Sequence, residues 1–263
     1  MIKEWFIHSI FLFLLCNIGT SQKYLFQDSF LLSASSLYLD KLNQIYAFKK
    51  GSSHLFKLNE DWSTNQELSS PFLSEYVTLD VSDPMKIMLF FPSYSSVQIL
   101  DESLGTLSDE FYSNFNLESA ICFFSTTQYC YFSEGKIHVK NILDQRIVNS
   151  ESIYYERENE ITTSILKTNG KEIFLLLPGI GLWQFSAFLN EEFFVEDSKI
   201  KYIDLKDNIL FYLKDNRIYS WNPRARPSEP IYTSNAKISS FAVNTKYLLI
   251  AEENLIRRFR WKN

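Results

Sequence analysis

The sequence predicts an all-β fold, a six-bladed β-propeller built from one repeated unit. Apolar positions that mark the second strand of each unit follow one another at steps of 42, 42, 44, 37 and 38 residues: Ile45, Ile87, Tyr129, Ile173, Leu210 and Leu248. A period of about 40 residues with several strands per unit is typical of propeller blades. The 23 Phe and 15 Tyr favour pleated sheets. After the first 21 residues, no run shows apolar residues at helical spacing.

Each unit is expected to contribute three easily recognised strands. First strands are predicted at 34–39, 76–81, 119–124, 161–166, 201–205 and 238–243. Second strands are near-continuous apolar runs, as expected where neighbouring blades cover both faces, at 44–48, 86–91, 128–132, 172–177, 208–213 and 246–251. Third strands alternate, as expected nearer the rim, at 54–58, 96–100, 136–140, 181–185, 217–221 and 255–259. The segments between first and second strands are rich in turn-forming residues.

The outer strands are expected in the connections that follow the third strands, at 60–75, 101–117, 145–160 and 222–232. The sixth unit has no such connection, because the chain ends at Asn263. We therefore predict that residues 23–26 close the ring as the outer strand of the last blade, which would also hide a sheet edge. An open stack of hairpins and two three-unit domains are the alternatives.

Residues 1–21 have the pattern of a signal peptide, followed by a single domain over 22–263. Lys3 precedes an apolar run at 6–18, and small residues stand before Gln22. The run is too short for a comfortable membrane-spanning helix. Lipidation of Cys16 and an uncleaved anchor are the alternatives. Export implies a periplasmic or outer-membrane-associated protein without an integral membrane span after cleavage.

The net charge of −5 argues against nucleic acid as a partner. The one basic stretch lies at the C-terminus and contains Arg257, Arg258, Arg260 and Lys262. Basic residues interleaved with aromatic ones can bind single-stranded nucleic acid. The alternation of residue types here instead favours the last β-strand of a sheet, with solvated charges on one face.

Cys122 and Cys130 would remain after signal cleavage, outside the cytoplasm, where disulfides persist. Their positions allow them to face each other on two strands joined by a short turn, so a disulfide is geometrically possible. The alternative is a pair of small buried apolar side chains. The sequence contains no CxxC motif, so it does not indicate a redox site.

A distinctive stretch runs from Leu79-Asp80-Val81-Ser82-Asp83-Pro84 through the strand at 86–91 to Ile99-Leu100-Asp101, and a second one lies at 39–46. These stretches resemble segments of a family of exported propeller-like proteins of Bacteroidetes. Asp83 stands where the family shows Asn, and Phe91 where it shows Tyr. The resemblance covers the first two units and implies a propeller fold and export, but no catalytic residue.

Candidate chemistry is sparse in the sequence. His54 and His138 fall on different units without metal-ligand spacing, and Gly179 and Gly181 fit a hairpin turn rather than a phosphate loop. Paired carboxylates are the remaining enzymatic route, yet Asp40, Asp83 and Asp207 recur at one structural position, which indicates turn chemistry.

We therefore expect an exported, non-enzymatic binding or assembly module, with no catalytic residue, no cofactor and no metal. Its partner would be an envelope protein or ligand, and the protein itself is expected to be a monomer. Arg224 and Arg226, in a Pro-rich loop, could contact an acidic partner. The alternative is a periplasmic hydrolase or lyase with its site at one mouth of the ring, which would show converging carboxylates there.

Overall fold

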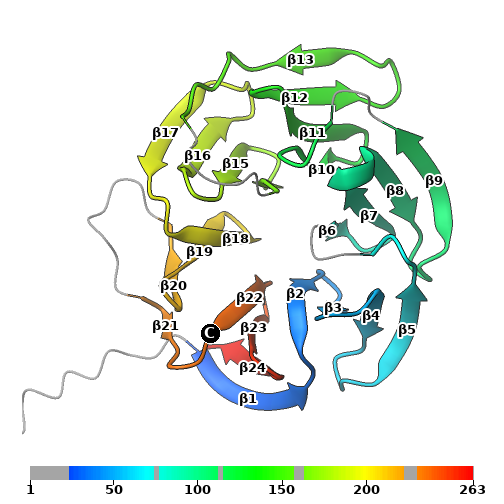
Figure 1. The fold of residues 1–263 in the computed structure, drawn as a ribbon, viewed down its shortest axis with the longest axis vertical. Helices are drawn as coiled ribbons and strands as arrows, with labels where there is room; N and C mark the ends of the chain where they lie inside the picture. The colour runs from blue at the N-terminus through cyan, green and yellow to red at the C-terminus, as the bar shows by residue number, and fades with distance from the viewer. Residues whose placement is uncertain (1–23, 74–76, 112–114, 157–162, 222–229, 263) are drawn as a thin grey trace, which may run out of the picture.

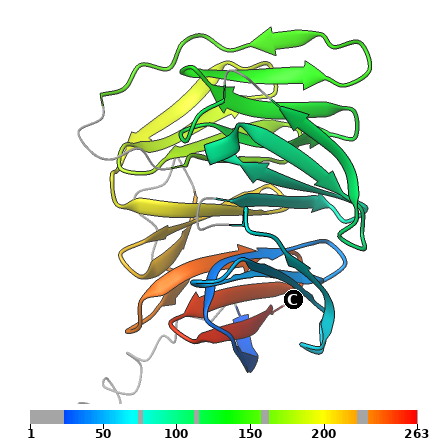
Figure 2. The same cartoon turned by 45° about the vertical axis from the view of Figure 1, so that its right-hand side comes forward.

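The computed structural model describes residues 24–73, 77–111, 115–156, 163–221 and 230–262. These residues form six four-stranded antiparallel sheets arranged in a ring, a β-propeller (Figure 1). Figure 2 shows the same ring obliquely, with the sheets side by side around it. The only helical element in these ranges is a 3₁₀ turn, η1 (Pro92–Tyr94). The predicted fold class is therefore confirmed.

Each blade consists of four strands, and in blades 1 to 5 these strands follow one another along the chain from the centre of the ring outwards. Blade 1 contains β2 (Ala34–Leu39), β3 (Ile45–Lys49), β4 (His54–Leu58) and β5 (Thr64–Ser69). Blade 2 contains β6 (Thr78–Asp83), β7 (Lys86–Phe91), β8 (Ser96–Leu100) and β9 (Thr106–Phe111). Blade 3 contains β10 (Ala120–Ser125), β11 (Gln128–Ser133), β12 (Lys136–Asn141) and β13 (Ile147–Asn149). Blade 4 contains β14 (Ile165–Thr168), β15 (Glu172–Leu177), β16 (Gly181–Ser186) and β17 (Glu191–Glu196). Blade 5 contains β18 (Ile200–Lys206), β19 (Ile209–Lys214), β20 (Arg217–Ser220) and β21 (Tyr232–Thr233). Blade 6 contains β22 (Ile238–Val243), β23 (Tyr247–Glu252), β24 (Leu255–Trp261) and, outermost, β1 (Tyr24–Leu31).

The apolar core is divided among the junctions between blades. The described residues form six buried clusters, and each cluster joins one blade to the next around the ring. Second strands supply side chains to the clusters on both of their sides, as Leu175 and Leu176 of β15 do. This arrangement explains why the second strands read as near-continuous apolar runs.

Ring closure by the N-terminal strand is confirmed. Strand β1 pairs antiparallel with β24 from Tyr24 opposite Trp261 to Leu31 opposite Leu255, so it is longer than the predicted piece at 23–26. The expected solvation of the C-terminal charges is wrong for Arg258, which is only 3% exposed. The reason is that its guanidinium pairs with Asp28 of β1 and lies over the ring of Trp62.

Some sequence predictions fall outside the described residues, namely the signal segment at 1–21 with Cys16 and the loop with Arg224 and Arg226. Within the described ranges, no helix is long and apolar enough to cross a membrane.

Candidate functional site

A cavity of about 790 Å³ opens at one mouth of the ring. All six innermost strands, or the turns that follow them, line it, so these turns gather at the same end of the ring. Concave sites with a few convergent polar groups are where proteins most often bind ligands. The mouth is therefore the candidate functional site of the described chain.

The strand register makes one position of each innermost strand equivalent in all six blades: Tyr38, Asp80, Cys122, Lys167, Asp204 and Ala242. All but the last of these residues line the cavity. Blade structure favours similar residues at equivalent positions, as the buried aliphatic markers of five second strands illustrate: Ile45, Ile87, Ile173, Leu210 and Leu248. A phenol, two carboxylates, a thiol and an ammonium at one position therefore require another explanation, and we assign them to the site.

Lys167 and Asp204 form an ion pair inside the mouth. The Nζ atom of Lys167 lies 2.9 Å from Oδ1 of Asp204, and both side chains are largely shielded from solvent. The other carboxylate oxygen of Asp204 accepts a hydrogen bond from the backbone N–H of Val243 in blade 6, at 2.9 Å. Burial lowers the pKa of Lys167, but the attraction of Asp204, followed by Tyr202 and Asp80, leaves this pKa above its usual value. Lys167 is thus a fixed cation at neutral pH.

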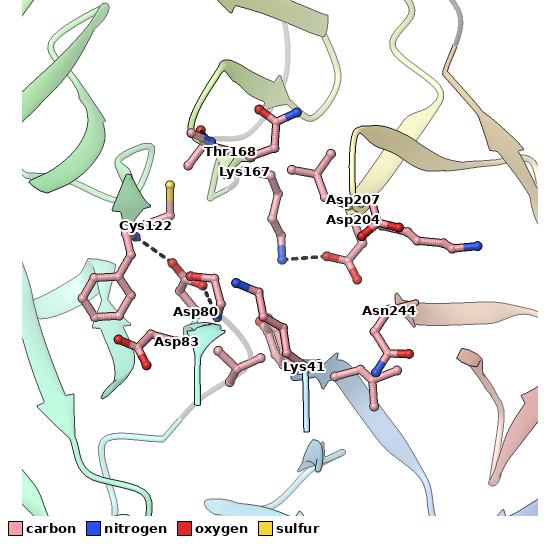
Figure 3. A pocket seen from close by; sticks show the side chains of 18 of the residues that line it. Lys41, Asp80, Asp83, Cys122, Lys167, Thr168, Asp204, Asp207 and Asn244 are labelled. Carbon is pink, nitrogen blue, oxygen red and sulfur yellow. Dashed lines mark hydrogen bonds and ion pairs between the residues drawn. The ribbon is translucent and has the colours of Figure 1, made fainter. Parts of the chain in front are cut away.

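Asp80 is held by the backbone and faces the same space. Its Oδ2 atom accepts a hydrogen bond from the N–H of Phe123 in blade 3 at 2.7 Å, and its Oδ1 atom accepts one from Ser82 at 2.9 Å. No ion pair joins Asp80 to a basic side chain of the described residues. Its charge nevertheless contributes to the raised pKa of Lys167. Figure 3 shows Asp80, Lys167 and Asp204 directed into the cavity from different blades.

The phenol and thiol groups at the mouth are neutral. Burial is the main reason that the pKa of Tyr38 is raised, and Lys167 lies 5.6 Å from the centre of its ring. A hydrogen bond to Cys130 and burial raise the pKa of Cys122. Because a thiol reacts as its thiolate, Cys122 is a poor nucleophile at neutral pH.

The rim of the mouth adds further charges. Lys41, Asp83, Lys206 and Asp207 also line the cavity, and the ammonium of Lys206 lies 4.2 Å from the ring centre of Trp261. Burial lowers the pKa of Lys206. The lining thus holds three lysines (41, 167 and 206) and four aspartates (80, 83, 204 and 207), an excess of one negative charge.

Asp40 and Asp83 bind backbone groups of their turns, as the sequence indicated. The expectation that the three turn aspartates share one structural position is wrong, because Asp40 lies two residues beyond Tyr38, whereas Asp83 and Asp207 lie three residues beyond the equivalent residues of their strands. Oδ1 of Asp40 accepts hydrogen bonds from the N–H groups of Leu42 and Gln44, both at 2.8 Å. Oδ1 of Asp83 accepts one from Met85 at 3.0 Å. Asp207 adopts the left-handed backbone region, with φ of 52°. Asp40 is buried beneath its turn and does not line the cavity, whereas the other two lie on the rim.

The histidines singled out in the sequence belong to the outer parts of their blades. His54 contacts Glu67 of β5, whereas His138 stacks on Tyr131 at 4.6 Å and hydrogen-bonds Asn149 at 2.7 Å. In the part of the chain that the structure describes, no group of three His, Cys, Asp or Glu side chains is arranged to hold a metal ion.

Cys122 and Cys130 lie directly opposite each other on β10 and β11, and both are free, buried thiols. Gly179 lies in the β15–β16 hairpin turn, with φ of 85°, and Gly181 begins strand β16. A Cβ atom on Gly181 would lie 2.4 Å from the carbonyl oxygen of Val195, so the close approach of β17 requires glycine there.

Motifs in the sequence do not point to Tyr38, Lys167 or Asp204. A usable signal is nevertheless present, because these residues occupy one position in successive first strands. Aligning the six first strands by the second-strand markers reveals a different ionisable side chain in most units.

No protein-family model and no curated protein matches this sequence. Among solved structures, the chain is similar to a streptogramin B lyase, with a TM-score of 0.62 and 11% identity over 93% of this chain and 100% of that chain. It is also similar to virginiamycin B lyase from Staphylococcus aureus, with a TM-score of 0.58 and 10% identity over 89% and 99% of the two chains. A third similar structure is BamB from Moraxella catarrhalis, with a TM-score of 0.50 and 9% identity over 84% and 67%. At these identities the likeness shows the β-propeller fold alone.

Proposed function

We propose that this protein is an exported, non-enzymatic binding or assembly module of the cell envelope, and that its partner binds at the mouth cavity. The observation that carries the proposal is the set of differing polar side chains at equivalent positions of five of the six blades. Their charges are fixed by neighbouring blades, as in the pair of Lys167 with Asp204 and the backbone contacts of Asp80.

Prearranged polar groups of this kind suit recognition. The lysine is charged and paired, the phenol and the thiol are neutral, and the carboxylates accept backbone hydrogen bonds. Such groups orient a bound molecule without having to move, which lowers the entropic cost of binding. The proposal of export rests on the signal-like segment at 1–21 and on the resemblance to exported propeller-like proteins.

The test is a pull-down from cell-envelope extract with the mature chain, residues 22–263. The variant Thr126→Trp places a large side chain on an exposed turn at the mouth, whereas Thr233→Trp changes an exposed threonine on an outer strand as the matched control. We expect a partner that the wild type and the control recover and that Thr126→Trp loses. Equal recovery by all three proteins would mean that the mouth is not the binding site.

A hydrolase or lyase acting at the same mouth is the second candidate. The observation in its favour is the size of the cavity, in a fold shared with two solved lyases. The two functions differ in the fate of the bound molecule. A binding module returns it unchanged after prolonged incubation, whereas an enzyme converts it.

A further inference from the structure

Two turns and the start of strand β19, all at the mouth, present large apolar side chains to solvent. Leu42 is 63% exposed, Met85 is 56% exposed and Ile209 is 46% exposed. Each is the direct neighbour of a residue that lines the cavity, namely Lys41, Pro84 and Asn208. These three side chains, here called the apolar tips, come from blades 1, 2 and 5 and lie beside the charged cavity.

Two of these tips are held in place by the turn aspartates. Asp40 binds the backbone N–H of Leu42, and Asp83 binds that of Met85. An apolar side chain on a fixed turn loses little freedom when a partner covers it. The tips are therefore suited to form contacts rather than being incidental exposed residues.

The tips and the cavity together fit a macromolecule better than a small ligand. Leu42, Met85 and Ile209 do not line the cavity, so a small molecule inside it would leave them in water. A loop of another protein can insert one side chain into the cavity and cover the tips with its flanking residues. Fully desolvated anchors surrounded by a contact ring are typical of protein interfaces.

The charges at the mouth specify the side chain that would enter. The rim carries two lysines (41 and 206) and two aspartates (83 and 207), so its formal charges cancel. In the inner layer, Lys167 balances Asp204, with which it pairs, and the carboxylate of Asp80 remains as the excess negative charge. A second cation placed beside Asp80 and away from Lys167 would neutralise this layer, whereas an added anion would increase its net charge.

We propose that the mouth binds a loop of a partner protein that carries a lysine or arginine flanked by apolar residues. The cationic group lies against Asp80, and the apolar flanks cover Leu42, Met85 and Ile209. This inference rests on the proposed function, because both place the partner at the mouth. It adds the chemical nature of the partner's contact segment.

The test is selection from a displayed library of disulfide-constrained loop peptides on the mature chain. We expect enriched peptides to contain Lys or Arg next to apolar residues. Their affinity should fall about tenfold or more for Asp80→Asn, the loss expected for one charge-assisted hydrogen bond. The double variant Leu42→Ser with Met85→Ser should weaken the same peptides, and it decides the outcome if Asp80→Asn does not fold.

The matched controls are Asp109→Asn on exposed strand β9 and Phe72→Ser, which changes an aromatic residue 54% exposed in the β5–β6 connection. Both should leave the affinity unchanged. Enriched acidic peptides that Thr126→Trp blocks would overturn this inference and leave the proposed function standing. Selection that yields no peptide blocked by Thr126→Trp would count against both.

Discussion

The guanidinium of Arg258 binds both carboxylate oxygens of Asp28. Its Nε atom lies 2.9 Å from Oδ1, and its Nη2 atom contacts Oδ2. The two residues are 230 positions apart, one on β24 and one on β1. The same guanidinium donates to the backbone carbonyl of Glu60 and lies over the rings of Trp62 and Tyr247, at 4.7 and 5.1 Å. One side chain thus joins β1, β23, β24 and the β4–β5 turn at the ring closure.

Replacing Arg258 should strongly destabilise the protein. Arg258→Ala leaves Asp28 without its bidentate partner and opens a void between two aromatic rings, so we expect a loss of about 3 kcal/mol in the free energy of unfolding. Arg146→Ala is the matched control, because that exposed arginine pairs with the exposed Asp144 and should cost about 1 kcal/mol or less. Urea unfolding measures both values, and similar losses would mean that the closure contact is unimportant.

Deleting residues 22–27 should weaken ring closure. The deletion removes Tyr24, a buried residue that packs edge-on against Phe259 at 5.1 Å and contributes about 1.5 to 3 kcal/mol. It also exposes part of the β24 edge, which favours association. We expect a lower melting temperature in calorimetry and oligomers in light scattering. Unchanged melting with a monodisperse monomer would show that this half of β1 is dispensable.

The carboxyl group of Asp40 should make stability depend on pH. Burial raises its folded-state pKa above the unfolded value. Its contribution is therefore fully present below the unfolded pKa and is lost as pH rises through the folded pKa. Asp40→Asn retains an oxygen for Leu42 and Gln44 and removes the buried charge. We expect the variant to gain stability relative to wild type as pH rises from about 4 to about 7.

Urea unfolding across that range measures the effect. Asp83→Asn is the control, because Asp83 occupies a comparable turn without being fully buried. A difference between Asp40→Asn and wild type that stays constant with pH would contradict the assignment to Asp40.

Cys122 should react slowly with thiol reagents in the folded protein. Its raised pKa leaves less thiolate at a given pH, and its side chain is buried. We expect iodoacetamide to label Cys122 at mildly alkaline pH only after unfolding, as followed by mass spectrometry. Rapid labelling of the native protein would disprove this.

The signal-like segment gives a further prediction. Mass spectrometry of the chain recovered from a cell-envelope fraction should find Gln22, or its cyclised form, at the new N-terminus. Cleavage before Cys16 with an acyl group on that cysteine would instead identify a lipoprotein.

The repeating strands could be predicted because their signal is local. Ile87 and its equivalents lie in apolar runs bounded by turn residues, and each run forms a strand whatever the rest of the chain does. The burial of Arg258 could not be predicted in this way, because it depends on β1, which is remote in the sequence. The same holds for Asp80, Lys167 and Asp204, which come from three blades and meet only when the blades pack together. Their arrangement depends on the packing of different blades rather than on any one unit.

Closure of the last blade by β1 also has a consequence for biogenesis. Strand β1 is synthesised before the other strands of the ring, yet its pairing partner β24 is synthesised after all of them. Any product truncated before residue 255 lacks that partner and cannot complete the sixth blade. The growing chain consequently leaves an unpaired edge available to chaperones and proteases until β24 has emerged. The architecture itself therefore distinguishes polypeptides that have reached β24 from those that have not.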